Sequence, residues 1–250
     1  MKINISKTPV ALGEAAAAKA AKVLRQAIEA KGKARLILST GQSQFETLQA
    51  LLAEAIDWSK VELFHLDEYI DLPDSHPASF RRYLLDRFIS KIQLKSVHLV
   101  NGEGDVDAHI KALNEAVSAE QVDLGLIGIG ENAHIAFNDP PADFTTEQPY
   151  IIVKLDDACK SQQVREGWFP DLDHVPTHAI SMSVRQILKC RTIISCVPHA
   201  VKAKAVSLTL EKPVSNEIPA TILKTHSDVT LFVDTASAAS LSEDVIARFS

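Results

Sequence analysis

Apolar and polar positions alternate along the chain in blocks that predict buried strands separated by helices. The clearest strand spans residues 122–129, which are apolar apart from Asp123 and are typical of a strand buried on both faces of a parallel sheet. Shorter apolar runs predict strands at 35–38, 61–66, 97–100, 179–184, 192–197 and 229–233. Apolar residues at helical spacing predict helices at 9–31, 45–56, 78–92, 106–117, 156–168, 201–210 and 236–249. This order favours parallel strands joined by right-handed crossovers.

The fold class that follows is α/β, with a Rossmann-like, mostly parallel sheet flanked by helices on both faces. No repeat, linker or low-complexity run divides the chain, so residues 1–250 are expected to form one domain. Hydrophobic residues make up 46% of the sequence, which suffices for a substantial core. The segment 139–149, DPPADFTTEQP, has the composition of a surface loop, and with the helix after it we expect a mobile lid.

Composition and charge narrow the classes of partner. A formal net charge of −6 offers no basic face for nucleic acid. No apolar run approaches the roughly 20 residues that span a bilayer, and the first residues do not resemble a signal peptide, so we expect a cytoplasmic protein without membrane contact. Three cysteines without a CxxC pair argue against a disulfide framework or a zinc knot. Any anionic ligand must be held by local donors.

The first candidate site is the polar turn between the strand 35–38 and the helix that follows. It consists of Ser39, Thr40, Gly41, Gln42 and Ser43. Backbone N–H groups at the start of a helix, with hydroxyls beside them, form an anion site that suits a phosphate. The turn has neither a Walker sequence nor GxGxxG, so it gives no support for nucleotide binding. A helix cap without a ligand is the alternative.

A pair of carboxylates, Asp67 and Glu68, ends the strand 61–66 and precedes Tyr69. Paired carboxylates in a crevice can separate their pKa values, so that one of them serves as a general base near neutrality. A solvated strand end is the alternative.

Lys202, in VPHAVKAKAV, opens the helix after the strand 192–197 and can neutralise a phosphate. A solvated helix face is the alternative for this lysine.

Polar side chains also follow the central strand directly. They are Glu131, Asn132, His134 and Asp139. Because ligands of open α/β sheets bind outside the carboxyl ends of the strands, a histidine beside carboxylates there favours acid–base catalysis over a structural role. The HxH and HExxH spacings of metal sites are missing, so no metal is expected.

Taken together, five blocks resemble the glucosamine-6-phosphate deaminase/isomerase family, which shares a superfamily with the 6-phosphogluconolactonases. The blocks are LSTGQSQFETLQALL, FHLDEYIDLPDSHPASFRRYL, LIGIGENAHIAFNDP, VPTHAISMSVRQIL and VPHAVKAKAV, in the order and approximate spacing of the family. The resemblance covers nearly the whole chain. It implies a Rossmann-like sheet and an enzyme that converts an amino-sugar 6-phosphate, such as glucosamine or galactosamine 6-phosphate, to a ketohexose 6-phosphate and ammonia without a cofactor.

The resemblance also implies a role for individual residues. Asp67 matches the base that moves a proton between C2 and C1, and His134 matches the acid–base that opens the sugar ring. Asp139 matches a glutamate that supports the histidine. Ser43 with its neighbouring amides matches the phosphate loop, and Lys202 matches a phosphate-binding lysine.

Two departures from the family pattern bear on activity. Asn132 stands where many members have an aspartate, with Ala133 in place of a glycine, and Asp139 or Glu131 is expected to take over the charge. The lid arginine has no aligned counterpart, since Arg165 is displaced. These departures make a non-catalytic sugar-phosphate sensor one alternative, and a lactonase of the same superfamily is the other. The sequence leaves open the epimer and the assembly of subunits, for which a homo-oligomer is one expectation.

Overall fold

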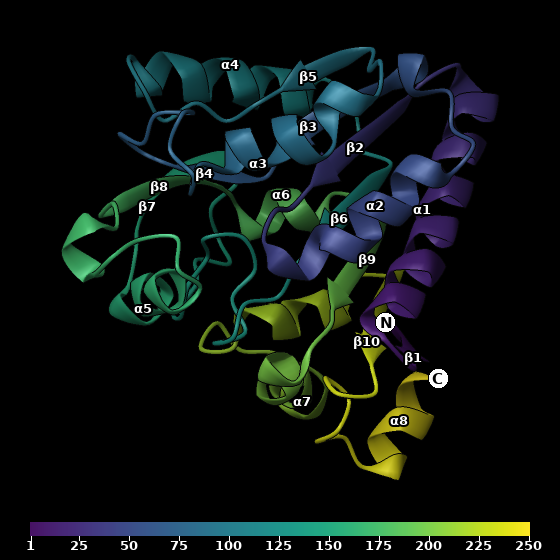
Figure 1. Cartoon of the computed structure of the whole chain (residues 1–250). Coiled ribbons are helices and arrows are strands. Elements are labelled where there is room, and N and C mark those ends of the chain that lie inside the picture. The colour runs from purple at the N-terminus through teal and green to yellow at the C-terminus, as the bar shows by residue number, and fades with distance from the viewer.

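A sheet of seven strands, all paired in parallel, forms the centre of the computed structural model, which describes residues 1–250 (Figure 1). In spatial order its strands are β1 (Lys2–Ser6), β10 (Val229–Asp234), β9 (Thr192–Val197), β6 (Leu124–Ile127), β2 (Ala34–Leu38), β3 (Val61–His65) and β5 (Ser96–His98). The chain therefore moves outward from β2 to one edge of the sheet and later returns to the other. The expected mostly parallel α/β fold is confirmed.

Helices cover both faces of this sheet. One face carries α1 (Pro9–Lys31), α2 (Phe45–Ala53) and α3 (Phe80–Arg87), and the other carries α4 (Val106–Ser118), α6 (Val184–Leu188), α7 (Ala203–Glu211) and α8 (Glu243–Phe249). Alternation along β2 divides the core, because Leu36 and Leu38 pack with α1 while Ile37 packs in the cluster on the opposite face. A strand buried on both faces needs the continuous apolar run seen in the sequence.

Helix α1 shows how local chemistry sets an element's bounds. The Thr8 side chain accepts a hydrogen bond from the Ala11 amide, Pro9 occupies the first turn, and Gly32 ends the helix at a φ of +74°. Alanines at positions such as 16 and 20 are fully buried, so the helix lies close against α2 and the sheet. Both ends of α1 match the prediction.

A second sheet of three antiparallel strands was not predicted. It consists of β4 (Asp67–Tyr69), β8 (His178–Met182) and β7 (Tyr150–Lys154), with β8 in the middle. The chain changes sheets at Leu66, whose amide donates to Leu38 of β2 while its carbonyl accepts from Met182. Residues 67–69 follow the carboxyl end of β3 as predicted, but they form a strand of the second sheet, which was not expected. Strand β7 was missed because this edge strand is half exposed.

Several element boundaries also differ from those predicted. The edge strand β1 was missed because its sequence KINIS is half polar. The predicted helices at 45–56, 78–92 and 236–249 are shorter, and α6 begins where the predicted strand 179–184 was to end. The predicted helix 156–168 is α5 (Asp157–Arg165), which is followed by Gly167 at a φ of +80°. None of the helices has both the length and the apolar character needed to cross a membrane.

Candidate active site

A cavity lies at the carboxyl ends of β2, β6 and β9, beside β4, and most of the predicted site residues line it. These are Thr40, Gly41, Gln42, Ser43, Asp67, Glu131, His134 and Lys202. Asp139 and Asn132 do not line the cavity but lie behind His134, in contact with one another. Strands that are far apart in the sequence thus bring an acidic group, an imidazole and an ammonium to one space.

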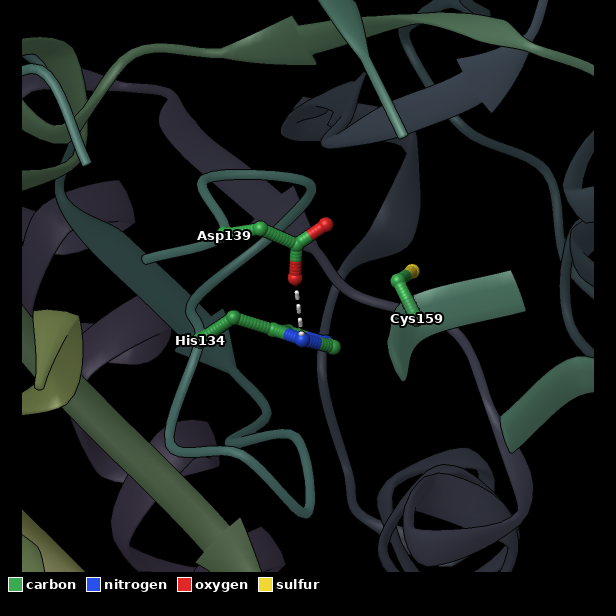
Figure 2. Close-up of side chains that lie close together, drawn as sticks. All are labelled: His134, Asp139 and Cys159. Atoms are coloured by element: carbon green, nitrogen blue, oxygen red, sulfur yellow. Dashed lines mark ion pairs between the residues drawn. The ribbon is translucent and has the colours of Figure 1, made fainter. Parts of the chain in front are cut away.

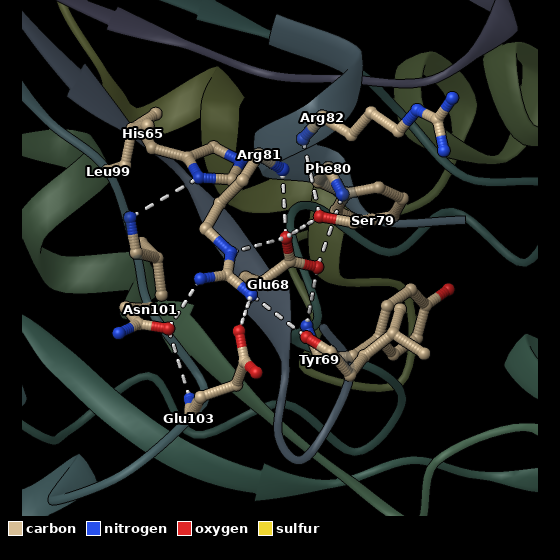
Figure 3. A network of polar contacts seen from close by, with 12 residues as sticks. His65, Glu68, Tyr69, Ser79, Phe80, Arg81, Arg82, Leu99, Asn101 and Glu103 are labelled. Carbon is tan, nitrogen blue, oxygen red and sulfur yellow. Dashed lines mark hydrogen bonds and ion pairs between the residues drawn. The ribbon is translucent and has the colours of Figure 1, made fainter. Parts of the chain in front are cut away.

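The two adjacent carboxylates on β4 point to opposite sides of the strand. The Glu68 carboxylate is fully buried and accepts hydrogen bonds from the amides of Tyr69 (2.9 Å), Phe80 (3.2 Å) and Arg81 (2.8 Å) and from the Ser79 hydroxyl (2.8 Å) (Figure 3). It therefore accepts from the unpaired amides at the start of α3. Burial raises its pKa, and these hydrogen bonds oppose that rise. Glu68 does not reach the cavity, so it is not the base.

The Arg81 guanidinium extends this network away from the cavity. Its Nε lies 3.4 Å from Glu68, and its two terminal nitrogens donate to Asn101 (2.5 Å) and Glu103 (2.7 Å) (Figure 3). Burial, together with the charge of Arg81, lowers the pKa of His65 to about 3, so this imidazole is neutral. Together these hydrogen bonds and ion pairs hold β4 in position.

Asp67 faces the cavity from the other side of β4. Its side chain is 5% exposed and accepts no hydrogen bond from the protein. Burial raises the pKa of Asp67 well above its usual range, and the nearby negative charge of Glu68 adds to that rise. A carboxyl group whose pKa is moved toward neutrality is a stronger proton acceptor than an ordinary aspartate.

His134 and Asp139 form the second chemical group of the site. His134 Nδ1 lies 2.9 Å from Asp139 Oδ1 (Figure 2). The same oxygen accepts a hydrogen bond of 3.1 Å from the Asn132 side-chain amide. Asn132 also accepts from the backbone N–H of His134 at 3.1 Å. Burial acts to raise the pKa of Asp139, but the contacts with His134, Asn132 and Cys159 together outweigh it, and the net shift is downward. Asp139 is therefore a stable anion behind the imidazole.

The turn that carries His134 depends on two small residues. A Cβ atom at Gly130 would lie 2.3 Å from the His134 ring, and the Gly130 amide donates to the His134 carbonyl at 2.9 Å. Ala133 has a φ of +66°, a left-handed conformation that is strained for alanine. The packing on either side holds the imidazole at the cavity wall.

Cys159 of α5 is the third neighbour of this pair and gives the one cluster with the composition of a metal site. One ligand atom from each of His134, Asp139 and Cys159 lies within 4.8 Å of the others (Figure 2). Burial and the charge of Asp139 raise the pKa of the Cys159 thiol, so it stays protonated. The three side chains form a polar cluster behind the cavity wall, in which Asp139 Oδ1 lies 2.9 Å from His134 Nδ1.

Lys202 is the one lysine that lines the cavity. Its side chain is 7% exposed and has neither a hydrogen bond nor an ion pair in the protein. Burial lowers the pKa of Lys202, while the negative charges of Glu166 and Glu131 act to raise it. An unpaired buried ammonium is costly, and a bound anion offsets that cost. The turn 39–43, with Gly41 at a φ of +103°, lines the same cavity.

Helix α5 contributes a wall of the cavity that the sequence did not predict. Its residues there are Gln162, Gln163 and Glu166, followed by Trp168. The sequence carries no signal for these glutamines, since glutamine is mostly exposed in proteins and their burial is seen only in the structure. Arg165 does not line the cavity; it forms an ion pair of 2.6 Å with Glu131, and its side chain is 57% exposed.

Known proteins share this sequence and this fold. A model of the family described as glucosamine-6-phosphate isomerases/6-phosphogluconolactonase matches residues 7–232. A glucosamine-6-phosphate deaminase of Bacillus cereus is 32% identical over 248 residues, covering 99% of this chain and 91% of the relative. One from Oenococcus oeni is 32% identical over 244 residues, covering 97% and 100%.

Solved structures agree with these sequence matches. A structure described as a monomeric glucosamine-6-phosphate deaminase has a TM-score of 0.86 and 31% identity, covering 96% of this chain and 99% of that one. A 6-phosphogluconolactonase of Trypanosoma brucei has a TM-score of 0.79, covering 96% and 98%, but at 15% identity it shares the fold alone.

The Glu68 network gives a prediction for stability. Glu68→Gln keeps the side-chain shape but turns an NH2 group toward buried donors and removes the charge beside Arg81. We expect the free energy of unfolding in urea to fall by about 3–5 kcal/mol. Glu103→Gln is the matched control, because Glu103 binds the same guanidinium but is 43% exposed, and its loss should be below about 1 kcal/mol. Equal losses for the two variants would contradict the role given to Glu68.

Asp67 gives a prediction for the pH dependence of stability. Its folded-state pKa is raised, so the unfolded state loses the proton first, and ionisation of this group disfavours folding as pH rises above about 4. Asp67→Asn should therefore be more stable than the wild type at pH 7, by about 1.4 kcal/mol for each unit of the upward shift, and the gap should close toward pH 4. Urea unfolding at several pH values measures this. Asp74→Asn, at an exposed position, should show no such gap; a destabilised Asp67→Asn protein would refute the prediction.

Proposed function

The chain belongs to the family of glucosamine-6-phosphate isomerases and 6-phosphogluconolactonases, and from this premise we propose that it is a glucosamine-6-phosphate deaminase that forms fructose 6-phosphate and ammonia. The observation that carries the proposal is one cavity lined by a bare carboxyl group, an imidazole and an unpaired ammonium. An amino-sugar phosphate has the matching chemistry, with an amine near its reacting carbons and a phosphate at C6.

The phosphate is assigned to the turn 39–43 and Lys202. The Ser43 hydroxyl and the amides around Gly41 supply hydrogen-bond donors, and the ammonium supplies a positive charge. Binding at this remote end fixes the position of the reacting carbons, so part of the binding energy is available to orient them.

The reacting carbons are assigned to Asp67 and His134. His134, with Asp139 behind it, moves the proton that opens the sugar ring to an aldehyde. Asp67 then takes the proton from C2, which leaves an enol-amine, and returns it to C1, which leaves an imine at C2. Water adds to the imine and ammonia leaves, so one water is consumed and the product is the 2-ketose. No step requires a cofactor or a metal.

Asn132 is assigned a positioning role. Its amide holds the Asp139 oxygen that faces the imidazole, and its oxygen holds the His134 backbone. Glu131, paired with Arg165, is placed at the cavity wall, where its charge attracts the substrate amine. Of the two carboxylates considered for the support of His134, Asp139 is therefore assigned that role and Glu131 is not.

A lactonase activity is the second candidate and has less support. Lactone hydrolysis needs no base at C2, whereas Asp67 is a buried carboxyl group with no structural partner. The lactonase structures, at 14–22% identity, share only the fold with this chain.

We also propose a cytoplasmic enzyme, because its three cysteines are free and buried, as suits a reducing compartment. A structure at 31% identity is described as a monomeric deaminase, which favours a monomer over a homo-oligomer for this chain.

Ammonia release tests the proposed function directly. Purified protein should release ammonia from glucosamine 6-phosphate, with galactosamine 6-phosphate and 6-phosphogluconolactone as the other substrates of the panel. Asp67→Asn should lower the rate by about 10²–10⁴, since it removes a positioned proton acceptor. Lactone turnover without ammonia release, or an Asp67→Asn protein as active as the wild type, would refute the proposal.

Lys202 gives a prediction about binding. Lys202→Ala should raise KM for glucosamine 6-phosphate by about 10–100-fold, the effect of losing a charged hydrogen bond worth about 1.5–3 kcal/mol, and should change kcat less. Steady-state kinetics measure both constants. The exposed Lys204 of the same segment is the matched control, and Lys204→Ala should leave KM unchanged. A fall in kcat alone would show that Lys202 does not bind the phosphate.

A further inference from the structure

One face of α5 is buried and polar. Cys159, Gln162, Gln163 and Glu166 recur at positions i, i+3, i+4 and i+7 and so share one face of the helix. Gln162 is 8% exposed and Gln163 is 7% exposed. A helix face buried in this way is ordinarily apolar, because each buried polar group needs a partner.

Three of these four side chains have partners. Cys159 lies beside Asp139. Glu166 accepts hydrogen bonds from Gln162 Nε2 at 2.7 Å and from Trp168 Nε1 at 3.1 Å, so its carboxylate is held in the cavity wall.

Gln163 is the exception. Its side-chain amide makes no hydrogen bond with the protein, its Oε1 atom is buried, and the residue lines the cavity. A buried amide without a partner costs about 1–3 kcal/mol, whichever way the amide is oriented. A ligand in the cavity that carries hydroxyl groups would supply the missing partners.

The position of Gln163 along α5 indicates which part of the ligand it meets. With a rise of 1.5 Å per residue, Gln163 is about 6 Å from Cys159 along the helix axis, and Glu166 is about 10 Å from it. Cys159 lies beside His134 and Asp139, just behind the cavity wall, whereas Glu166 lines the cavity and its charge acts on that of Lys202. Gln163 therefore lies between the reacting end and the phosphate end.

We propose that Gln163 determines substrate specificity by hydrogen-bonding the hydroxyl groups on C3 and C4 of the bound sugar phosphate. This assignment rests on the proposed function, which places C1 and C2 at Asp67 and His134 and the phosphate at Lys202. A primary amide both donates and accepts, so it suits a pair of neighbouring hydroxyls. Inverting C4 turns one hydroxyl away, so Gln163 selects between glucosamine 6-phosphate and galactosamine 6-phosphate.

Calorimetric binding tests the assignment in the Asp67→Asn protein, in which turnover is slow. We compare it with the same protein carrying Gln163→Met, which keeps the length of the side chain and removes its hydrogen bonds. The affinity for the preferred epimer should fall about tenfold, the loss of roughly 1.4 kcal/mol of hydrogen bonding, and the ratio of the two epimers' affinities should move toward one. Affinity for inorganic phosphate should not change.

Two further readouts separate recognition from structure. Gln163→Met should leave the ligand-free melting temperature unchanged or raise it, because an unpartnered amide is removed. Lys160→Met, on the same helix but away from the cavity, should leave all three affinities unchanged.

Each outcome bears on a different claim. Unchanged epimer affinities in Gln163→Met, or an equal loss for inorganic phosphate, would overturn the role of Gln163 and leave the deaminase function standing. If the Asp67→Asn protein with Gln163 intact binds neither epimer, the proposed function fails, and the role of Gln163 fails with it.

Discussion

The burial of the Glu68 carboxylate is the interaction on which the rest of the site depends. Four donors surround it, three of them backbone or hydroxyl groups at the start of α3, and the Arg81 guanidinium lies against it. A buried carboxylate this well bonded fixes the orientation of β4, because moving the strand would leave a charge unpaired. Side chains alternate along a strand, so fixing Glu68 outward from the cavity fixes Asp67 into it. Two adjacent acidic residues thus have opposite roles: one holds the strand and the other is left without partners for the reaction.

The same separation of roles extends across the cavity. Asp139 is anionic and accepts hydrogen bonds, whereas Asp67 accepts none from the protein and has a raised pKa. Their surroundings therefore shift the pKa values of the two carboxyl groups in opposite directions. Lys202, which lines the same cavity, is buried without an ion pair and has only the charges of Glu166 and Glu131 to support it, which leaves a place for an anion. A substrate that carries the complementary charges offsets the free-energy cost of burying these two unpaired groups.

Much of the fold and part of the site follow from the sequence, for identifiable reasons. The continuous apolar runs of β2, β6 and β9 mark strands buried on both faces, and the polar residues after each strand must meet at one edge of a parallel sheet. The small antiparallel sheet escaped prediction because β4 follows β3 without a turn residue and β7 is half exposed. Gln163 escaped because sequence alone does not reveal that a glutamine is buried, and Glu68 could be told from Asp67 only by its contacts.

The most direct test of the central assignment is a crystal structure of the Asp67→Asn protein with glucosamine 6-phosphate bound. The assignment predicts the phosphate against Lys202 and the turn 39–43, the ring oxygen at His134, and C2 about 3–3.5 Å from the side chain at position 67, the separation of reacting atoms. A sugar bound with its C1–C2 end away from residue 67, or with its phosphate at His134, would contradict it.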